Sequence, residues 1–198
     1  PEGKNRVTWQ DRDTLLIGRD WGEGSLTTSG YPRTVRRWKR GTPIASAVEI
    51  AAGEIQDVSV GAFRIDDGDT RRLFVSRGKT FYTTQITHIA PDGAHIPSPL
   101  PDTADIQDVL EGQVIALLNK PFRTFPEGSL IAYGIDDVLA GKPARFEQVY
   151  VPSPSEALES VSAGKSVLWV KLLDDVSGKL VALRRTGPGA WSPQAMPL

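Results

Sequence analysis

The chain has 198 residues, of which 39% are hydrophobic, so it is long enough for one domain or two small ones with a packed core. Its 23 Lys and Arg side chains balance 24 Asp and Glu, and no overall field would attract nucleic acid or an anionic membrane. The chain contains no cysteine, which excludes disulfides, iron–sulfur clusters and thiolate zinc sites and leaves the compartment open between cytoplasm and periplasm.

No apolar run approaches the roughly 18 residues of a membrane span, and the first residues contain no signal-peptide hydrophobic region. We therefore expect a protein without membrane or nucleic-acid partners. The chain begins at Pro1 with strand-like sequence a few residues later, and it ends at Leu198 directly after a strand and turn pattern. These ends predict a segment of a longer chain.

Four short strands are predicted in residues 5–52. They are Asn5–Gln10, Thr14–Gly18, Thr34–Arg40 and Ala47–Ala51. The second of them is apolar throughout, as expected of a strand buried on both faces. The Arg and Lys of the third strand predict a solvated outer face rather than a nucleic-acid patch, because Trp38 is the one aromatic residue among them. The Gly-, Ser- and Thr-rich stretch Asp20–Pro32 is predicted to be a long loop.

The same pattern recurs in residues 57–97. Its predicted strands are Asp57–Ile65, Arg72–Ser76 and Thr80–Ala90, followed by an irregular edge because the prolines at 97, 99 and 101 cannot donate to a ladder. The acidic stretch Asp66–Asp69 resembles a calcium loop at first sight. It lacks the alternating acidic positions and the later Glu of such a loop, so a hairpin turn is predicted.

Two further sets of strands follow in residues 104–152 and 157–198. The predicted strands are Ala104–Leu110, Gln113–Leu118, Ser129–Ile135 and Phe146–Val151, then Ala157–Ala163, Ser166–Leu173, Lys179–Leu183 and Ala190–Met196. Asp136–Gly141 has an Asp start and a Gly stop, which predicts a single helical turn.

The four sets recur at a spacing that is typical of propeller blades. The buried second strands are centred on Leu16, Phe74, Ala116 and Trp169, with separations of 58, 42 and 53 residues. Helical repeats are excluded because no long window has a 3.6-residue apolar period. An immunoglobulin-like or jelly-roll sandwich remains the main competitor, but its strands should alternate between apolar and polar residues. The sequence therefore favours an all-β fold of four four-stranded antiparallel blades.

A resemblance to a known family covers essentially the whole chain. It is most specific in Trp9, Asp13–Leu16, Gly24–Thr27, Ser29–Pro32 and Arg37–Pro43, and it continues in Asp57–Val60, Pro126–Leu130 and Leu173–Val176. These segments resemble the β-propeller of a bacterial branch of the prolyl oligopeptidases, serine peptidases in which a propeller sits over an α/β-hydrolase domain. The resemblance implies that the four blades are part of a seven-bladed propeller.

The family's catalytic machinery has no counterpart in the sequence. A complete member would carry a Ser nucleophile in a G-x-S-x-G elbow, followed by an Asp and a His. The nearest strings, at Gly22–Leu26 and Glu127–Leu130, lack Gly on both sides at the required spacing. His88 and His95 have no nucleophile motif nearby and no third ligand for zinc. We therefore predict no catalytic residue, metal or cofactor site in this chain, whose parent would be a serine-type endopeptidase.

The Asp20–Pro32 loop is the candidate functional element. Meander connectivity places it at the end where one blade is linked to the next, and the resemblance implies that the hydrolase domain covers this end. Residues predicted to lie near the domain interface and the substrate entrance are Trp21, Ser25, Thr27, Ser29 and Tyr31. An ordinary surface loop is the alternative.

The resemblance implies that the propeller restricts access of peptide substrates to a catalytic domain, which would be its main partner. Two other functions stay open: a stand-alone propeller that binds a protein or peptide, and a sandwich that binds sugars or a cell surface. Four blades from a larger ring would leave apolar terminal faces. The chain is therefore expected to close into a four-bladed ring or to form a homodimer through its terminal blades.

Overall fold

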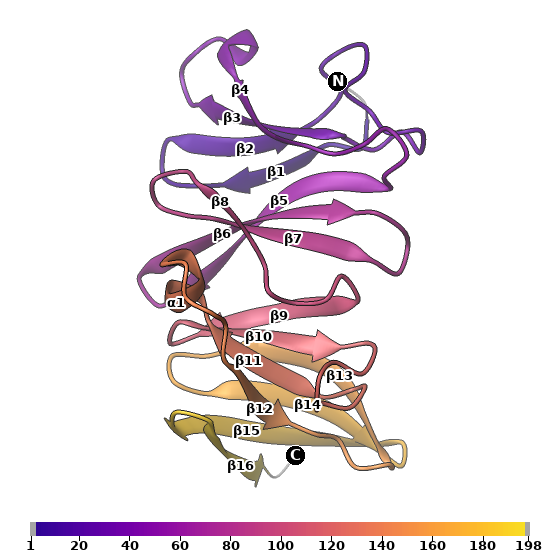
Figure 1. Ribbon diagram of the computed structural model, residues 1–198, viewed down its shortest axis with the longest axis vertical. Helices are drawn as coiled ribbons and strands as arrows, with labels where there is room; N and C mark the ends of the chain where they lie inside the picture. Colours follow the sequence, from indigo (N-terminus) through magenta and orange to yellow (C-terminus); the bar gives the residue numbers. More distant parts are fainter. Residues whose placement is uncertain (1–2, 197–198) are drawn as a thin grey trace. The chain divides into compact units, whose positions relative to one another are not determined.

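The computed structural model describes residues 3–196, which form four four-stranded sheets (Figure 1). Each sheet takes four consecutive strands in chain order, as in a simple antiparallel meander. A sandwich would instead pass strands from one sheet to another. The predicted all-β fold of four propeller blades is confirmed.

The strands of each blade have the following bounds. The first blade holds β1 (Arg6–Trp9), β2 (Thr14–Gly18), β3 (Thr34–Lys39) and β4 (Val48–Ala52), and the second holds β5 (Ser59–Asp67), β6 (Thr70–Gly78), β7 (Thr84–Ile89) and β8 (His95–Pro97). The third holds β9 (Ala104–Leu110), β10 (Gln113–Leu118), β11 (Leu130–Gly134) and β12 (Phe146–Tyr150), with the helical turn α1 (Ile135–Leu139) after β11. The fourth holds β13 (Glu156–Ala163), β14 (Leu168–Asp174), β15 (Ser177–Gly187) and β16 (Ala190–Met196).

One predicted strand begins several residues too early. The sequence predicts a strand from Thr80, whereas β7 begins at Thr84. Lys79 N donates to Thr83 O over 2.9 Å and the hydroxyls of Thr80 and Thr83 lie 2.7 Å apart, so these residues close a turn instead. The helical turn predicted from Asp136 begins one residue earlier, at Ile135.

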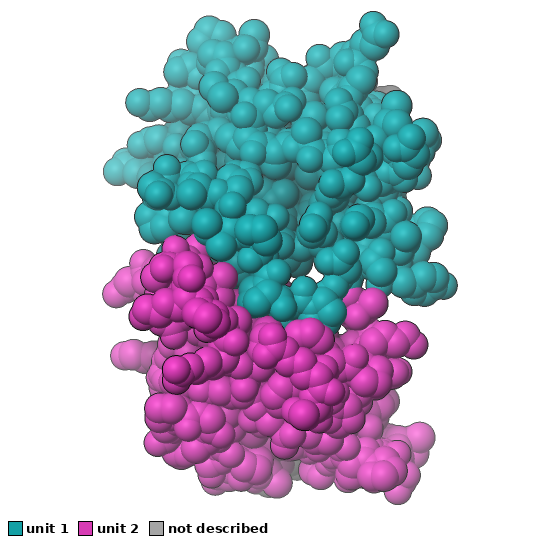
Figure 2. Space-filling view, viewed as in Figure 1, with its two compact units in different colours: residues 1–65, 71–102 teal, residues 66–70, 103–198 magenta. Residues whose placement is uncertain are grey.

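The chain divides into two compact units, shown in Figure 2. The first contains residues 1–65 and 71–102, and its core lies between the first two sheets. The core residues are Leu16 and Val35 from the first sheet and Val60, Val75 and Ile89 from the second. Beside them, Phe74 stacks on Phe63 with ring centroids 4.8 Å apart. Apolar side chains from facing sheets thus hold the two blades together.

The second unit contains residues 66–70 and 103–198, and its core is built in the same way. It is formed by Leu110, Ile115, Leu130, Ala132 and Val149 of the third blade with Leu168, Val170, Leu172, Val181 and Leu183 of the fourth. Because alternate residues of a strand face opposite sides, Trp169 points away from this core and is only half-buried. This strand was expected to be buried on both faces. Within this unit, β14 is buried on the face that packs against the third blade.

A buried carboxylate ties the third blade to the fourth. Glu156 begins β13 with a side chain that is 5% exposed and forms an ion pair with Lys179 of β15. Its Oε2 also accepts hydrogen bonds of 2.8 Å from Ser153 N and from the hydroxyl of Tyr150 at the end of β12. The bond to Lys179, followed by that to Ser153, lowers the pKa of Glu156 to about 2. The ionised carboxylate therefore stabilises the folded state.

We expect Glu156→Gln to reduce the free energy of unfolding by about 2 kcal/mol at pH 7, because Lys179 loses its buried partner. A carboxyl whose pKa is depressed on folding contributes stability that is lost as the pH falls from 4.5 towards 2. The variant should therefore lose less stability than the wild type in this range. Urea denaturation at pH 7 and at stepwise lower pH measures both effects.

Glu159→Gln is the matched control on the same strand. Glu159 pairs with Lys171 over 2.8 Å, but the two side chains are 32% and 59% exposed, and such surface pairs contribute little. Equal losses in the two variants would contradict the structural role given to Glu156.

Candidate functional site: the Asp20–Pro32 loop

The Asp20–Pro32 loop joins β2 to β3 and lies against the segment that links the first blade to the second. Thr28 N donates to Ile55 O over 2.8 Å, and Thr27 Oγ1 donates to Val58 O over 3.2 Å. Both acceptors belong to the connection between β4 and β5. The loop therefore occupies the end of the blades at which the sequence places it.

The first half of the loop is a turn organised by Asp20 and Ser25. Asp20 Oδ1 accepts hydrogen bonds from Gly22 N over 2.8 Å and from Ser25 Oγ over 3.0 Å. These two bonds hold the pKa of Asp20 below its usual value. Ser25 Oγ also accepts a bond of 2.8 Å from Trp21 N, and Ser25 is 5% exposed. Its hydroxyl is thus engaged in the turn and does not face solvent.

The second half of the loop is closed around Thr27, which is also 5% exposed. Thr27 N donates to Tyr31 O over 2.8 Å, and Thr27 Oγ1 accepts from Tyr31 N over 3.3 Å. Ser25 and Thr27, both predicted as interface residues, therefore shape the loop from inside.

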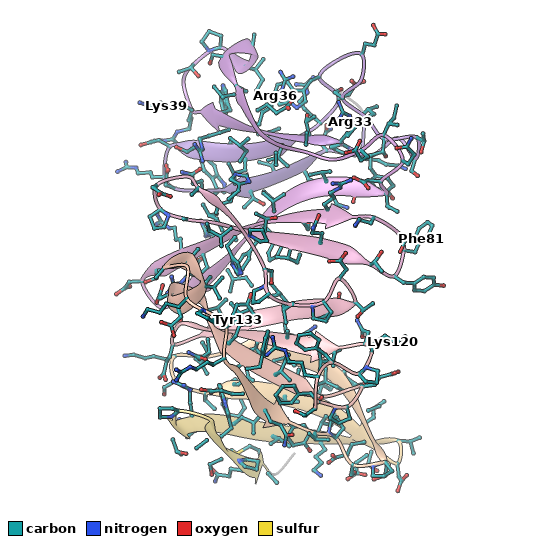
Figure 3. All side chains as sticks on the ribbon, in the orientation of Figure 1. Arg33, Arg36, Lys39, Phe81, Lys120 and Tyr133 are labelled. Atoms are coloured by element: carbon teal, nitrogen blue, oxygen red, sulfur yellow. The ribbon has the colours of Figure 1, made fainter. Side chains whose placement is uncertain are left out.

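Arg33 fixes this loop to the blade link, and the sequence analysis did not single it out. Its Nε donates to Gly24 O over 2.7 Å and its Nη1 donates to Gly53 O over 2.8 Å. Figure 3 labels Arg33 beside the loop. The sequence signal for this role is an Arg directly after a Gly- and Ser-rich loop, because a guanidinium group can donate to several backbone carbonyl oxygens of such a loop.

Trp21, Ser29 and Tyr31 provide the outer surface of the loop. The guanidinium groups of Arg19 and Arg36 lie 5.2 and 4.7 Å from the centroid of the Trp21 ring. Lys4 Nζ lies 3.8 Å from the centroid of the Tyr31 ring and donates to Ser29 O over 3.1 Å. Ser29 is exposed, and the two rings are half-buried. These three residues are placed where another surface could contact them.

Two strongly exposed aromatic side chains lie at the same end of this unit. Phe81 and Tyr82, in the turn between β6 and β7, are 89% and 88% exposed, and Figure 3 shows Phe81 projecting away from its blade. Gly78 at the end of β6 accepts a backbone hydrogen bond of 2.8 Å from Val58 N, which places this turn beside the blade link. Neither aromatic residue was predicted to be a surface residue, because the sequence pattern placed both in a strand.

Ser129 and the two histidines, which the sequence raised as catalytic candidates, lie on separate segments of the chain. Ser129, from the second nucleophile-like string, is fully buried and donates its hydroxyl to Pro126 O. His88 is fully buried, and His95 is exposed on β8. Within residues 3–196, no three His, Cys, Asp or Glu side chains are grouped so that they could hold a metal ion. No helix in this range is long and apolar enough to cross a membrane.

Comparisons with known proteins connect the blades to peptidases. The chain is 32% identical to the uncharacterized peptidase y4nA of Sinorhizobium fredii over 97% of its own length and 28% of that protein. It superimposes on a post-proline cleaving enzyme from Rickettsia typhi with a TM-score of 0.85 at 22% identity, over 98% of this chain and 30% of that one. A solved prolyl endopeptidase gives a TM-score of 0.73 at 16% identity, over 100% and 29%.

No family model matches the chain. The chain spans less than a third of the length of the relatives and structures it resembles. The agreement nevertheless runs through all four blades and includes a peptidase relative at 32% identity over nearly the whole chain. The chain is therefore similar to an uncharacterized peptidase over nearly its whole length, and it has the fold of β-propeller blades in a solved post-proline cleaving enzyme and a solved prolyl endopeptidase.

Proposed function

We propose that this chain is the part of a prolyl oligopeptidase-like serine peptidase that restricts the access of substrates to a separate catalytic domain. The observation that carries the proposal is the superposition of all four blades on a post-proline cleaving enzyme at a TM-score of 0.85. Hydrolysis after proline would then depend on residues outside this chain. A catalytic hydrolase domain would be its partner, and short peptides would be the substrates of the whole enzyme.

The end of the first unit that carries the Asp20–Pro32 loop has the properties of a surface covered by another domain. Phe81, Tyr82 and Ile55 leave large apolar side chains in solvent, at 89%, 88% and 49% exposure. Aromatic residues of this kind commonly anchor protein interfaces. The loop beside them is held by internal hydrogen bonds, so little conformational entropy would be lost on docking.

We expect replacement of Trp21 and Tyr31 by Ala in the full-length enzyme to change the selection of substrates by length more than the rate at which a short peptide is hydrolysed. Loss of these rings would loosen the entrance, raising kcat/KM several-fold for a long proline-containing peptide relative to a short one. Steady-state kinetics on a short chromogenic peptide and a 30-residue peptide measure the ratio.

Arg184→Ala is the matched control, because Arg184 is an exposed β15 residue far along the chain from the loop. If the Trp21 and Tyr31 variant folds normally and its ratio of kcat/KM for the long peptide to that for the short one is unchanged, these two residues do not control the substrate entrance. The same result after deletion of Gly22–Ser29 would dispose of a functional role for the whole loop.

A further inference from the structure

Arg33 makes four hydrogen bonds that connect the Asp20–Pro32 loop to the link between the first two blades. Two of them go to the loop: Arg33 N donates to Ser25 O over 2.9 Å, and Arg33 Nε donates to Gly24 O over 2.7 Å. The other two go to the link, where Arg33 Nη1 donates to Gly53 O over 2.8 Å and Arg33 O accepts from Gly53 N over 2.9 Å. One residue therefore binds both segments, each through its backbone and through its side chain.

The link is a firm support for the loop. Its backbone at Gly53 packs directly against the side chains of Asp57 and Val60, which leave no room for a Cβ. The side chain of Asp57 is 7% exposed, and it forms an ion pair with Arg77 at the end of β6. Gly53 cannot shift without disturbing these buried groups, so a loop tied to its carbonyl oxygen is held in one place.

The glycines of the loop, in contrast, are not held by packing. Gly22, Gly24 and Gly30 have φ angles of 109°, 74° and 72°, and a Cβ at any of them would have no atom within 4 Å. Glycine has no side chain to restrict its backbone, so each of these positions can serve as a hinge. Besides Arg33, Thr27 and Thr28 each contribute one hydrogen bond to the link. The position of the loop therefore depends on a small number of hydrogen bonds, and Arg33 makes several of them.

We propose that Arg33 is a positioning residue that holds the Asp20–Pro32 loop as a fixed rim, so that the substrate entrance selects peptides by length without a moving lid. A planar guanidinium group donates to two carbonyl oxygens in one fixed geometry, and its loss would free the loop to move about its glycines. This inference rests on the access function proposed above, because a fixed rim affects selection only if the loop lies at the entrance.

Amide hydrogen exchange of the 198-residue chain measures the positioning role without any enzymatic activity. Arg33→Met removes both side-chain hydrogen bonds and keeps an unbranched side chain. We expect the amide of Thr28, which donates to Ile55 O of the link, to exchange at least tenfold faster in this variant. The amides of β2 in the same blade should keep their wild-type rates, because the sheet itself is not altered.

Two further variants make the exchange experiment specific. Arg33→Lys keeps one donor group, so its Thr28 amide should exchange at an intermediate rate. Arg37→Gln is the matched control, since it removes an Arg from β3 that donates to Gln10 Oε1 instead of to the loop. The Thr28 amide of this control should exchange as in the wild type.

In the full-length enzyme, Arg33→Met should raise kcat/KM several-fold for a 30-residue proline-containing peptide relative to a short chromogenic one, with the change in the KM of the long peptide. Arg37→Gln should leave this ratio unchanged. The inference is overturned if Thr28 exchanges at the wild-type rate in Arg33→Met, if the β2 amides accelerate equally, or if the loop is released and the ratio stays the same.

The outcomes also separate this inference from the access function on which it rests. Wild-type exchange in Arg33→Met, together with a raised ratio in the Trp21 and Tyr31 variant, would overturn the role of Arg33 and support the access function. A released loop with unchanged ratios in both variants would overturn the access function, and the proposed selection by a fixed rim with it.

Discussion

Replacement of Gly53 by Ala should reduce the free energy of unfolding by about 3 kcal/mol, the largest effect we expect of a single methyl group in this chain. A Cβ at this position would lie 2.5 Å from Asp57 Oδ2 and 2.6 Å from Val60 Cγ2. Val60 is 1% exposed and belongs to the core between the first two sheets. Neither atom can move without disturbing buried structure.

The carboxylate of Asp57 is held as firmly as the valine. It accepts a hydrogen bond of 2.7 Å from Glu54 N and one of 2.5 Å from Arg77 Nε, and its side chain is 7% exposed. Burial alone would raise the pKa of Asp57, but the bonds from Arg77 and Glu54 N outweigh it and lower the pKa. Displacing this carboxylate would break a buried ion pair as well as create a clash.

Gly187→Ala provides the comparison. No atom lies within 4 Å of the Cβ position at Gly187, and its backbone does not need a glycine conformation. Chemical denaturation should find this variant within about 0.5 kcal/mol of the wild type. Equal stability of the two Ala variants would show that the link between β4 and β5 is looser than the structure indicates.

The second large effect is a loss of stability in mild acid that depends on His88. This residue of β7 is fully buried, with its ring centroid 5.2 Å from that of Phe74. Burial, and secondly the positive charge of Arg72, lower the pKa of His88 from 6.5 to about 4. Between these values the unfolded chain binds a proton that the folded chain does not, so stability falls as the pH decreases. The loss should reach about 3 kcal/mol by pH 4.

Urea denaturation at several pH values between 7 and 4 measures this slope. His88→Met fills the same space without a titrating group, so its stability should change less over this range. His95→Gln alters the exposed histidine of β8 and should follow the wild type. Parallel curves for His88→Met and the wild type would assign the acid sensitivity to other groups.

The blade architecture could be read from the sequence because burial leaves a clear signal in short strands. The runs at Thr14–Gly18 and Gln113–Leu118 contain no polar side chain after their first residue, and both are strands with the predicted bounds. The two-residue turn at Gly68 and Asp69 was also predictable, since Gly68 has a φ of 61° that few other residues adopt. Local composition carries this information without knowledge of distant contacts.

Contacts between distant segments were not predictable in the same way. The roles of Arg33, Gly53 and Asp57 depend on which carbonyl or carboxylate group lies nearby after folding. The periodic pattern of the sequence does not reveal these neighbours. Trp169 was expected to be buried on both sides, but its face of β14 has no other sheet against it within the second unit. The predicted loop residues likewise form an inner pair and an outer set because of hydrogen bonds within the loop, which the sequence does not reveal.

These four blades are expected not to hydrolyse peptide bonds by themselves. The direct measurement is the rate at which the purified 198-residue chain cleaves a proline-containing chromogenic peptide, with and without a serine-reactive phosphonate. We predict a rate equal to that of buffer in both cases. Turnover by the chain that the phosphonate abolishes would contradict the account, because it would place a reactive serine within these four blades.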